Sequence, residues 1–557
     1  MITKSIRATA FVGLLAAAAL VAAPLSAAGS DTPPFETVPT PSPALQGPNL
    51  ADDMRDIPAA IERADKLGIE RLSSSASTLG VSTGVHRIYF STVDVIAAAT
   101  ENENANLTEA TARNAVAAID AFWQEQSAGK VRFQFGGFET RPALGGTSCN
   151  PDAVALKIEN AAFNGYFANG KWVGTGNHLV VLSNENAACS NGAAFGTVGY
   201  NGGTIFSAGG LDSALGVPTL YHEFGHNLGF GHANAAVCRT KNIDAVASAY
   251  RFEPKQATSP GALITTSIVC PVEQYGDLLD IMGYTVQNGA PHASSVERSA
   301  AGWLATSKPG AGKKTTVALR SLNNSTGTRA IRVTDPRTGA VYFVEYRTNE
   351  GRDVTSWEFQ NTTPNSYAGN QYSGGYFYLR QSGNVSNGMV RVLRVLGLRA
   401  GRPLESVVLA VAPVSDDGKA RLNSLQAGQS FVTAGSGTKI TVNSLSPAAG
   451  ANITVTTAKS ASKVASKPAK STIKKKKTSK LAIVVAAVGN SKPTGTVTVY
   501  AKGKKLKAYS LSASKSGRIT VTLPKFTKKG TYTITVKYSG SATVAASASK
   551  SVKLKVK

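Results

Sequence analysis

Three histidines lie in one short segment, His222-Glu223-Phe-Gly-His226-Asn-Leu-Gly229-Phe-Gly-His232. On a helix, residues four positions apart share a face, so His222 and His226 can present their imidazoles to one metal ion with Glu223 beside it. A helix that continued past His226 would carry His232 away from that metal. Because Gly229 lacks a Cβ and can adopt a positive φ, we expect the chain to turn back there and to deliver His232 as a third ligand. Three neutral nitrogens leave one zinc position for water, which is the open coordination of a catalytic site.

A second motif follows the histidines and reads Tyr275-Gly-Asp-Leu-Leu-Asp-Ile-Met282-Gly-Tyr284. Together the two motifs resemble the metzincin zinc peptidases, and among these the gametolysin-type secreted metallopeptidases. The resemblance covers the region from about residue 85 to residue 303 and, more loosely, the segment 342–347. It implies a Zn²⁺ ion held by the three histidines, with Glu223 as the catalytic carboxylate. It also implies that Met282 forms a hydrophobic base under the zinc without binding it.

The resemblance suggests a role for two further features, and each of them also has a purely structural interpretation. Tyr284 stands where some metzincins have a tyrosine that binds zinc at rest and stabilises the oxyanion, so it is either a catalytic residue or a packed core tyrosine. The run 202–208 resembles the exposed edge strand on which metzincins bind an extended peptide, and the alternative is an ordinary inner strand. The other histidines (His86, His178 and His292) show no ligand spacing, and we expect ordinary strand and loop residues there.

The chemistry expected of this site is peptide hydrolysis. Zinc lowers the pKa of its bound water towards ~7 and polarises the scissile carbonyl. Glu223 would take the water's proton and then supply it to the leaving amine, acting as base and acid in turn. The sequence therefore predicts a zinc metalloendopeptidase with a protein or peptide substrate. The rival hypothesis is a surface-binding or adhesive protein in which the zinc domain is a relic.

The elements around the motifs predict an α/β metzincin catalytic domain at residues 84–305. Apolar runs at 85–90, 131–135 and 178–182 indicate strands. An apolar face from Ala112 to Trp123 indicates a helix that Asn106 could cap and that stops at Gly129. The order of strands and helices is that of an α/β sandwich. Ahead of this domain, Lys4, Arg7 and an apolar run read as a signal peptide at residues 1–28, followed by a propeptide or flexible leader at 29–83.

After residue 305 the pattern changes to short alternating runs, which predict all-β sandwich domains. We expect a β-sandwich accessory domain at 306–457, a Lys-rich linker at 458–480, and an immunoglobulin-like domain at 481–557. The last segment resembles the bacterial immunoglobulin-like repeats of secreted surface proteins, on the runs 493–500 and 530–540.

The net charge of +25 is concentrated at the end of the chain. Residues 451–557 contain 24 Lys plus Arg and neither Asp nor Glu, whereas the first 450 residues are nearly neutral. A nucleic-acid enzyme would carry this charge around its active cleft, so we expect no specific nucleic-acid partner. The basic tail predicts binding to an anionic polymer of the cell wall, and the alternative is that it only maintains solubility. No later run is long enough for a transmembrane segment, so we expect a secreted, extracellular protein that is associated with the cell wall through its tail.

Export makes disulfides the expected state of the four cysteines (Cys149, Cys189, Cys238 and Cys270). Four cysteines allow three pairings. We favour Cys149 with Cys189 and Cys238 with Cys270 because neighbouring pairs close short loops.

Overall fold

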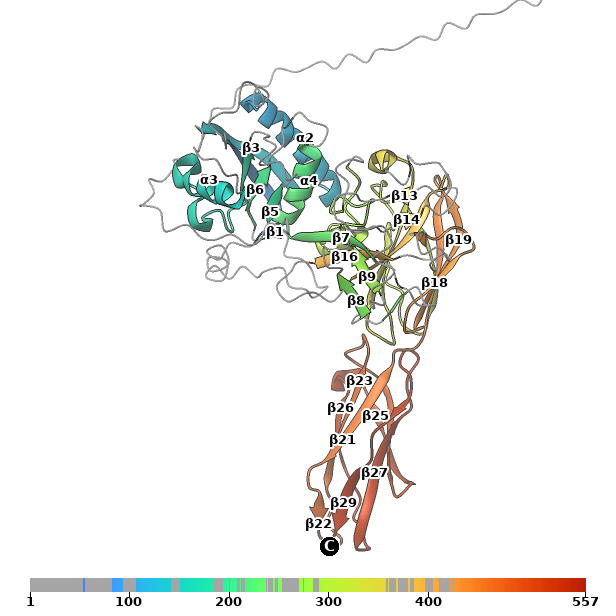
Figure 1. Ribbon diagram of the computed structural model, residues 1–557. Coiled ribbons are helices and arrows are strands. Elements are labelled where there is room, and N and C mark those ends of the chain that lie inside the picture. Colours follow the sequence, from blue (N-terminus) through green and yellow to red (C-terminus); the bar gives the residue numbers. More distant parts are fainter. Residues whose placement is uncertain are drawn as a thin grey trace, which may run out of the picture.

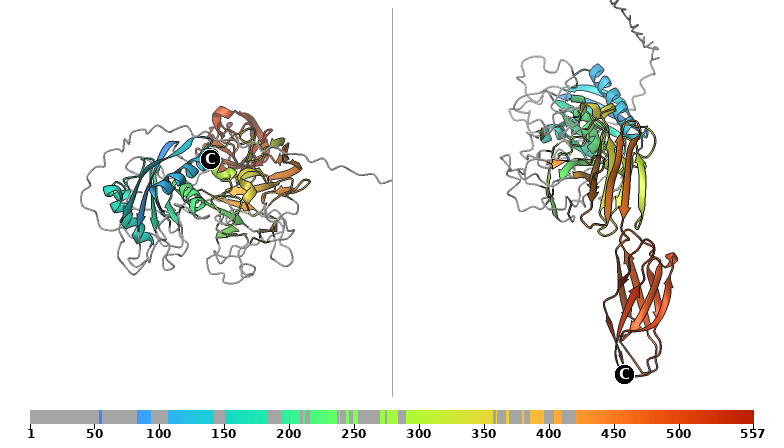
Figure 2. Two further views of the ribbon diagram at one scale, coloured as in Figure 1. Left: turned by 90° about the horizontal axis from the view of Figure 1, so that it is seen from above. Right: turned by 90° about the vertical axis from the view of Figure 1, so that its right-hand side faces the viewer.

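The computed structural model describes residues 54–55, 83–93, 107–141, 151–183, 194–199, 201–207, 211, 216–236, 238, 244–245, 249–252, 270–273, 275–283, 290–356, 359, 367–368, 379–380, 385–395, 404–409, 421–422 and 424–557. The predicted signal peptide, nearly all of the predicted leader, Cys149, Cys189 and Tyr284 lie outside these residues. Within the described part, most elements are strands and few are helices. Figures 1 and 2 show a body of strands and helices from which a C-terminal β domain projects, with the C-terminus at its far end.

The first sheet has the strand order β1-β5-β6-β4-β2-β3. Its strands are β1 (Met54–Arg55), β2 (Gly84–Val93), β3 (Val131–Arg141), β4 (Asn177–Ser183), β5 (Phe195–Thr197) and β6 (Gly203–Ser207). The helices near it are α2 (Glu109–Ser127), α3 (Pro151–Gly165) and α4 (Gly216–Asn227), with the 3-10 turn η1 (Ala168–Gly170). All pairs in this sheet are parallel except β5 with β6, which is antiparallel.

Side chains alternate across this sheet and build a core on each face. Ile88 and Phe90 face α2 and α4, where they pack with Trp123 and Phe224. Tyr89 and its neighbours on β4 face α3 instead. Helices therefore cover both faces, and α4, which carries the histidine motif, lies on the α2 side. Helix α2 begins at the capping residue Thr108 rather than at Asn106, since the Thr108 hydroxyl accepts from the Thr111 amide.

The second and third sheets form a sandwich. The second sheet has the order β11-β12-β15-β16-β7-β9-β8 and the third the order β10-β20-β19-β18. The strands are β7 (Phe230–Ala236), β8 (Tyr250–Phe252), β9 (Cys270–Glu273), β10 (Lys314–Leu319), β11 (Ala330–Thr334), β12 (Val341–Arg347), β15 (Met389–Val395), β16 (Leu404–Leu409), β18 (Ser430–Val432), β19 (Thr438–Ser446) and β20 (Gly450–Thr457). A small sheet joins β13 (Tyr367–Ala368), β14 (Leu379–Arg380) and β17 (Arg421–Leu422), and α5 (Ser295–Ala300) and η4 (Gly351–Thr355) complete this part.

The boundary predicted at residue 305 does not separate two independent units. Strand β7 follows α4 directly, yet it pairs in parallel with β16 of the sandwich, over residues 404–409. Trp303, Phe343 and Leu393 also share one core with α2 and α4. The histidine segment is therefore shared between the helix-covered sheet and the sandwich.

The C-terminal domain is a smaller sandwich. One sheet contains β21 (Ser462–Pro468), β23 (Lys480–Ala487) and β26 (Arg518–Thr522); the other contains β22 (Thr472–Ile473), β24 (Gly495–Ala501), β25 (Lys504–Leu511), β27 (Gly530–Tyr538), β28 (Ser547–Ala548) and β29 (Val552–Val556), and η5 (Ala513–Lys515) follows β25. The linker predicted at 458–480 is wrong, because β21 pairs with β23 and β22 pairs with β29. Val464 and Ile473 enter the core of the domain. Lysines on the exposed positions between them give this segment the composition of a linker although it forms strands.

Candidate metal centre

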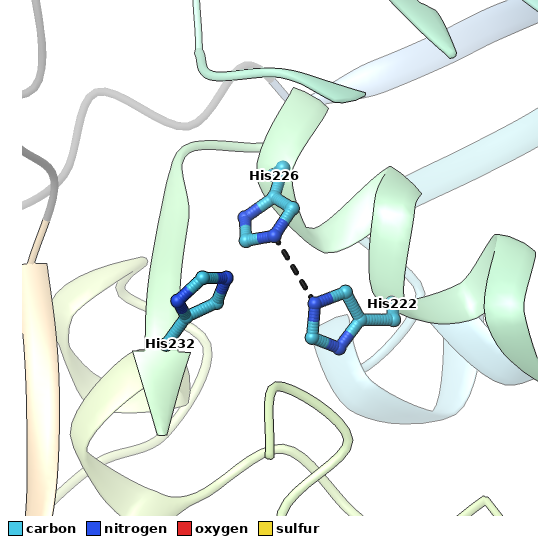
Figure 3. A group of neighbouring side chains, drawn as sticks. All are labelled: His222, His226 and His232. Carbon is cyan, nitrogen blue, oxygen red and sulfur yellow. Dashed lines mark hydrogen bonds between the residues drawn. The ribbon is translucent and has the colours of Figure 1, made fainter. Parts of the chain in front are cut away.

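Helix α4 and strand β7 bring the three predicted histidines together (Figure 3). His222 and His226 lie on one face of α4 and His232 lies on β7, all buried. One nitrogen from each ring lies within 4.8 Å of the others. The turn between helix and strand depends on Gly229, whose φ of 98° is the positive value expected from the sequence.

The hydrogen bonds of two rings fix which nitrogen is available to a ligand. His222 Nδ1 donates to the Ile281 carbonyl at 2.8 Å, and His226 Nδ1 donates to the Phe230 carbonyl at 2.9 Å. In a neutral imidazole, a protonated Nδ1 leaves the lone pair on Nε2. The two Nε2 atoms face each other at 3.1 Å. Two lone pairs at this distance repel unless they share a positive charge, so the arrangement fits a cation held by Nε2 atoms whose rings are oriented by backbone carbonyls.

The predicted methionine turn lies directly against the histidine helix. Met282 is fully buried, and a Cβ on Gly225 of α4 would clash with its sulfur atom. The Met282 carbonyl accepts from the Ala233 amide at 2.8 Å, next to His232 on β7. Because Ile281 holds the His222 ring, this turn positions two of the three histidines.

Glu223 lies beside the histidines and against strand β5. A Cβ placed on Gly196 would lie 3.2 Å from Glu223 Oε2, so the backbone of β5 passes close to the candidate catalytic carboxylate. Among the alternatives for residues 202–208, the structure shows the inner strand, because β6 lies between β4 and β5. Strand β5 lies next to the edge strand β1, which comes from the predicted leader and pairs with β5 through Met54 and Arg55.

Sequence reasoning missed Tyr275, the first residue of the methionine-turn motif. Its ring centroid lies 3.9 Å from that of His232 and 5.9 Å from that of His222. Its φ of 59° is in the left-handed region, which is costly for a bulky side chain and is found at functional sites. The Asn234 side chain accepts from the Tyr275 amide at 3.3 Å and donates to the His232 carbonyl at 3.0 Å. Asn234 therefore links His232 to its aromatic neighbour Tyr275.

Two histidines expected to be ordinary form a buried chain behind α4. His178 Nδ1 donates to Asn227 Oδ1 at 2.8 Å, and His86 Nδ1 donates to His178 Nε2 at 2.8 Å. The Asn227 amide continues the chain by donating to the Thr197 carbonyl on β5 at 2.8 Å. Burial, followed by the proximity of His86, lowers the pKa of His178 to about 3. A neutral His178 thus ties the C-terminal end of α4 to the sheet.

His292 is also buried, and it is not a member of the histidine cluster. Its ring lies 3.1 Å from Gln126 Oε1 and 2.8 Å from Asn323 Oδ1. Burial, with the nearby Arg298 and Arg347, lowers the pKa of His292 well below its ordinary value. It joins α2 to the sandwich and takes no part in the histidine cluster.

A buried charge network joins the methionine turn to the sandwich. Arg391 on β15 pairs with Asp277 of the turn motif and, at 3.2 Å, with Glu345 on β12. Glu345 also pairs with Arg347 at 2.8 Å, and Arg347 pairs with Asp353 at 2.9 Å. Burial alone would raise the pKa of Glu345, but Arg347 and Arg391 hold it at about 2. Removal of one partner would leave a buried charge uncompensated, which typically costs about 3–5 kcal/mol.

The disulfide between Cys238 and Cys270 is present, as favoured from the sequence. It joins the segment after β7 to the first residue of β9, on the strand that pairs with β7. This bond therefore secures the strand that carries His232.

Comparisons with known proteins identify only the C-terminal part. Residues 464–557 match the family model of the bacterial Ig-like domain (group 3), which supports the immunoglobulin-like prediction and places its start ahead of residue 481. No curated protein matches the chain. A solved structure of fibronectin(III)-like modules of CbhA from Clostridium thermocellum is 11% identical, covers 45% of this chain and 89% of its own, and has a TM-score of 0.13, which is too low to support an argument.

The described helices include none that is both long enough and apolar enough to cross a membrane.

Proposed function

We propose that this protein is a secreted zinc-dependent endopeptidase of the metzincin type. Its α/β catalytic domain would include strand β7, which pairs with the sandwich. The observation that carries the proposal is the convergence of His222, His226 and His232, with two rings oriented by backbone carbonyls. Buried histidines that serve only packing would not require two Nε2 atoms to face each other at 3.1 Å.

The donor set fits zinc. Three imidazole nitrogens are the ligands of several catalytic zinc sites, and hydrogen bonds from the distal ring nitrogens to carbonyls are the usual support for such ligands. Zinc would supply Lewis acidity and a reactive water at neutral pH. The packing of Met282 against Gly225 agrees with the hydrophobic base implied by the metzincin resemblance.

Glu223 is the residue of this chain that would move the proton. It is 2% exposed and follows His222 on α4, next to the histidines. We assign it the abstraction of a proton from the attacking water and its delivery to the leaving amine. General acid–base catalysis of this kind contributes about 10²–10⁴-fold to the rate.

The proposal is tested by the metal content and peptidase activity of two carboxylate variants. Glu223→Ala should retain one zinc per chain, measured by mass spectrometry of the metal, and lose at least about 10²-fold in peptide hydrolysis. Glu109→Ala, at an exposed position on α2, is the control and should keep both. Wild-type activity in Glu223→Ala, or no zinc in the wild-type protein, would exclude this function.

The second candidate is a surface-binding protein with a relic zinc domain, and the C-terminal Ig-like domain is the observation that favours it. It predicts zinc binding without hydrolysis of any peptide in a complex digest. Cleavage sites read by mass spectrometry, and abolished by a chelator, would decide for the peptidase. An Ig-like domain is compatible with an extracellular location, which agrees with the signal peptide expected from the sequence.

A further inference from the structure

Nine of the 23 lysines in residues 458–557 lie at the end of the C-terminal domain that faces away from the body (Figure 1). We define the distal tip as the turn 474–477 after β22, Lys502 after β24, the loop 524–529 before β27, and Lys557. It carries nine lysines, all exposed: Lys474, Lys475, Lys476, Lys477, Lys502, Lys525, Lys528, Lys529 and Lys557. The opposite end, which meets the sandwich, has Lys459, Lys492 and Lys515.

Hydrogen bonds hold these separate segments together as one surface. The Lys475 amide donates to the Lys557 carbonyl at 2.8 Å, and the Lys476 amide donates to the Phe526 carbonyl at 2.9 Å. The Tyr532 ring packs against Phe526 in a tilted arrangement with ring centroids 4.3 Å apart, and its hydroxyl donates to the Lys528 carbonyl. The Lys502 ammonium lies 4.7 Å from the Tyr532 ring centroid. The backbone of the tip is therefore ordered, and it holds the Cα atoms of these lysines at fixed positions.

Two features of the tip are energetically unfavourable for the folded domain. Residues 451–557 contain no carboxylate side chain that could neutralise the lysines, so the ammonium groups repel one another. Lys476 and Lys502 have φ values of 62° and 46°, in the left-handed region that glycine or asparagine would adopt at less cost. A polyanion bound at the tip would remove the repulsion.

The side chains at the tip indicate which class of polyanion it binds. Its cations are all lysines, which bind phosphates as point charges, and it lacks the arginine forks that read bases. Phe526 is 6% exposed and its ring is covered by Tyr532, so it offers no platform for a stacked base. The large hydrophobic side chains that are exposed within the described residues (Val85, Val354 and Val432) lie outside this domain, so none at the tip can enter a bilayer. We infer that the distal tip binds a linear phosphodiester polymer of the cell envelope and thereby holds the enzyme body away from that polymer.

The test compares two variants of the full chain with equal charge. The tip variant is Lys474→Gln, Lys477→Gln, Lys525→Gln and Lys528→Gln. The control variant is Lys463→Gln, Lys467→Gln, Lys507→Gln and Lys537→Gln, at exposed positions on the strands. Binding of fluorescent poly(glycerol phosphate) is measured by anisotropy between 50 and 200 mM salt. If about five lysines each contact a phosphate, wild-type affinity should fall roughly 10²-fold over this range.

The tip variant should bind at least tenfold more weakly and with a shallower salt dependence, while the control changes less than threefold. Equal losses in both variants would show a general charge effect and overturn the inference. Tighter binding of a single-stranded DNA of equal charge, or of phosphatidylglycerol vesicles, would overturn the assigned partner.

A second measurement does not depend on the folding of any variant. In the wild-type protein, poly(glycerol phosphate) should protect the tip lysines from acetylation, as read by mass spectrometry, more than Lys463, Lys467 and Lys537. Uniform protection would contradict the inference.

Discussion

Gly283 closes the turn that carries Met282, and Gly283→Ala should displace the metal centre without altering a ligand. The Gly283 amide donates to the Asp280 carbonyl at 2.8 Å. A Cβ at this position would clash with the Asp277 carbonyl oxygen and lie 2.8 Å from its carbon. Carbon atoms in contact are normally at least about 3.5 Å apart, so the turn must move by at least roughly 0.7 Å, and further to relieve the clash with the oxygen.

This movement should be felt at the histidines, because the neighbouring Ile281 carbonyl orients His222. Loss of such a supporting contact typically weakens metal binding about 10–100-fold, and overpacking a core costs about 1–3 kcal/mol. We expect both effects in Gly283→Ala, measured as zinc affinity by chelator competition and as unfolding free energy of the zinc-free protein. The control is Gly310→Ala, where the nearest atom to a new Cβ is Lys313 Cγ at 3.9 Å. Zinc affinity within twofold of this control would refute the argument.

Two further predictions concern the sheet behind the metal centre. Burial lowers the pKa of His178 to about 3 in the folded protein, whereas the unfolded chain has the ordinary value of about 6.5. The stability that neutral His178 contributes is therefore complete above pH 6.5 and is lost as pH falls towards 3. Between pH 6.5 and 4.5, the free energy of unfolding measured with denaturant should fall more steeply in the wild type than in His178→Gln, by up to about 1.4 kcal/mol per pH unit. Deletion of residues 1–83 removes β1 from β5, so the KM for an extended peptide should fall, whereas an unchanged KM would show that β1 does not compete with substrate.

The parts of the site that sequence reasoning could predict are local. The spacing of His222 and His226 follows from the helical repeat, and the need for a positive φ at Gly229 follows from the sharp turn to His232. The positions of strands β2, β4 and β12 follow from apolar runs that the sheets bury. In each case the signal lies within a dozen residues.

The parts that could not be predicted depend on pairing between distant segments. Nothing near His232 indicates that its strand would pair with residues 404–409. The contact of the Tyr275 ring with His232 depends on Asn234, which links two segments that are 41 residues apart. The approach of Tyr275 to His232 and His222 has no local signal in the sequence, and Tyr284 lies outside the described residues.

Strand β7 makes the sandwich a part of the proposed enzyme, and chain truncation tests this directly. A chain that ends at Thr457 keeps β16 and the buried pair of Arg391 with Asp277, so it should retain zinc and peptidase activity. A chain that ends at residue 305 loses the partner strand of His232 and removes Arg391, the ion-pair partner of Asp277.

The shorter chain should therefore lose zinc binding at micromolar zinc, measured by calorimetry, together with all hydrolysis. His232→Ala in the chain that ends at Thr457 supplies the reference for loss of one ligand alone. If the chain that ends at residue 305 bound zinc more tightly than this variant, the parallel pairing of β7 with β16 would not be what positions the third histidine. Such a result would restore the boundary expected from the sequence and assign the sandwich a role outside catalysis.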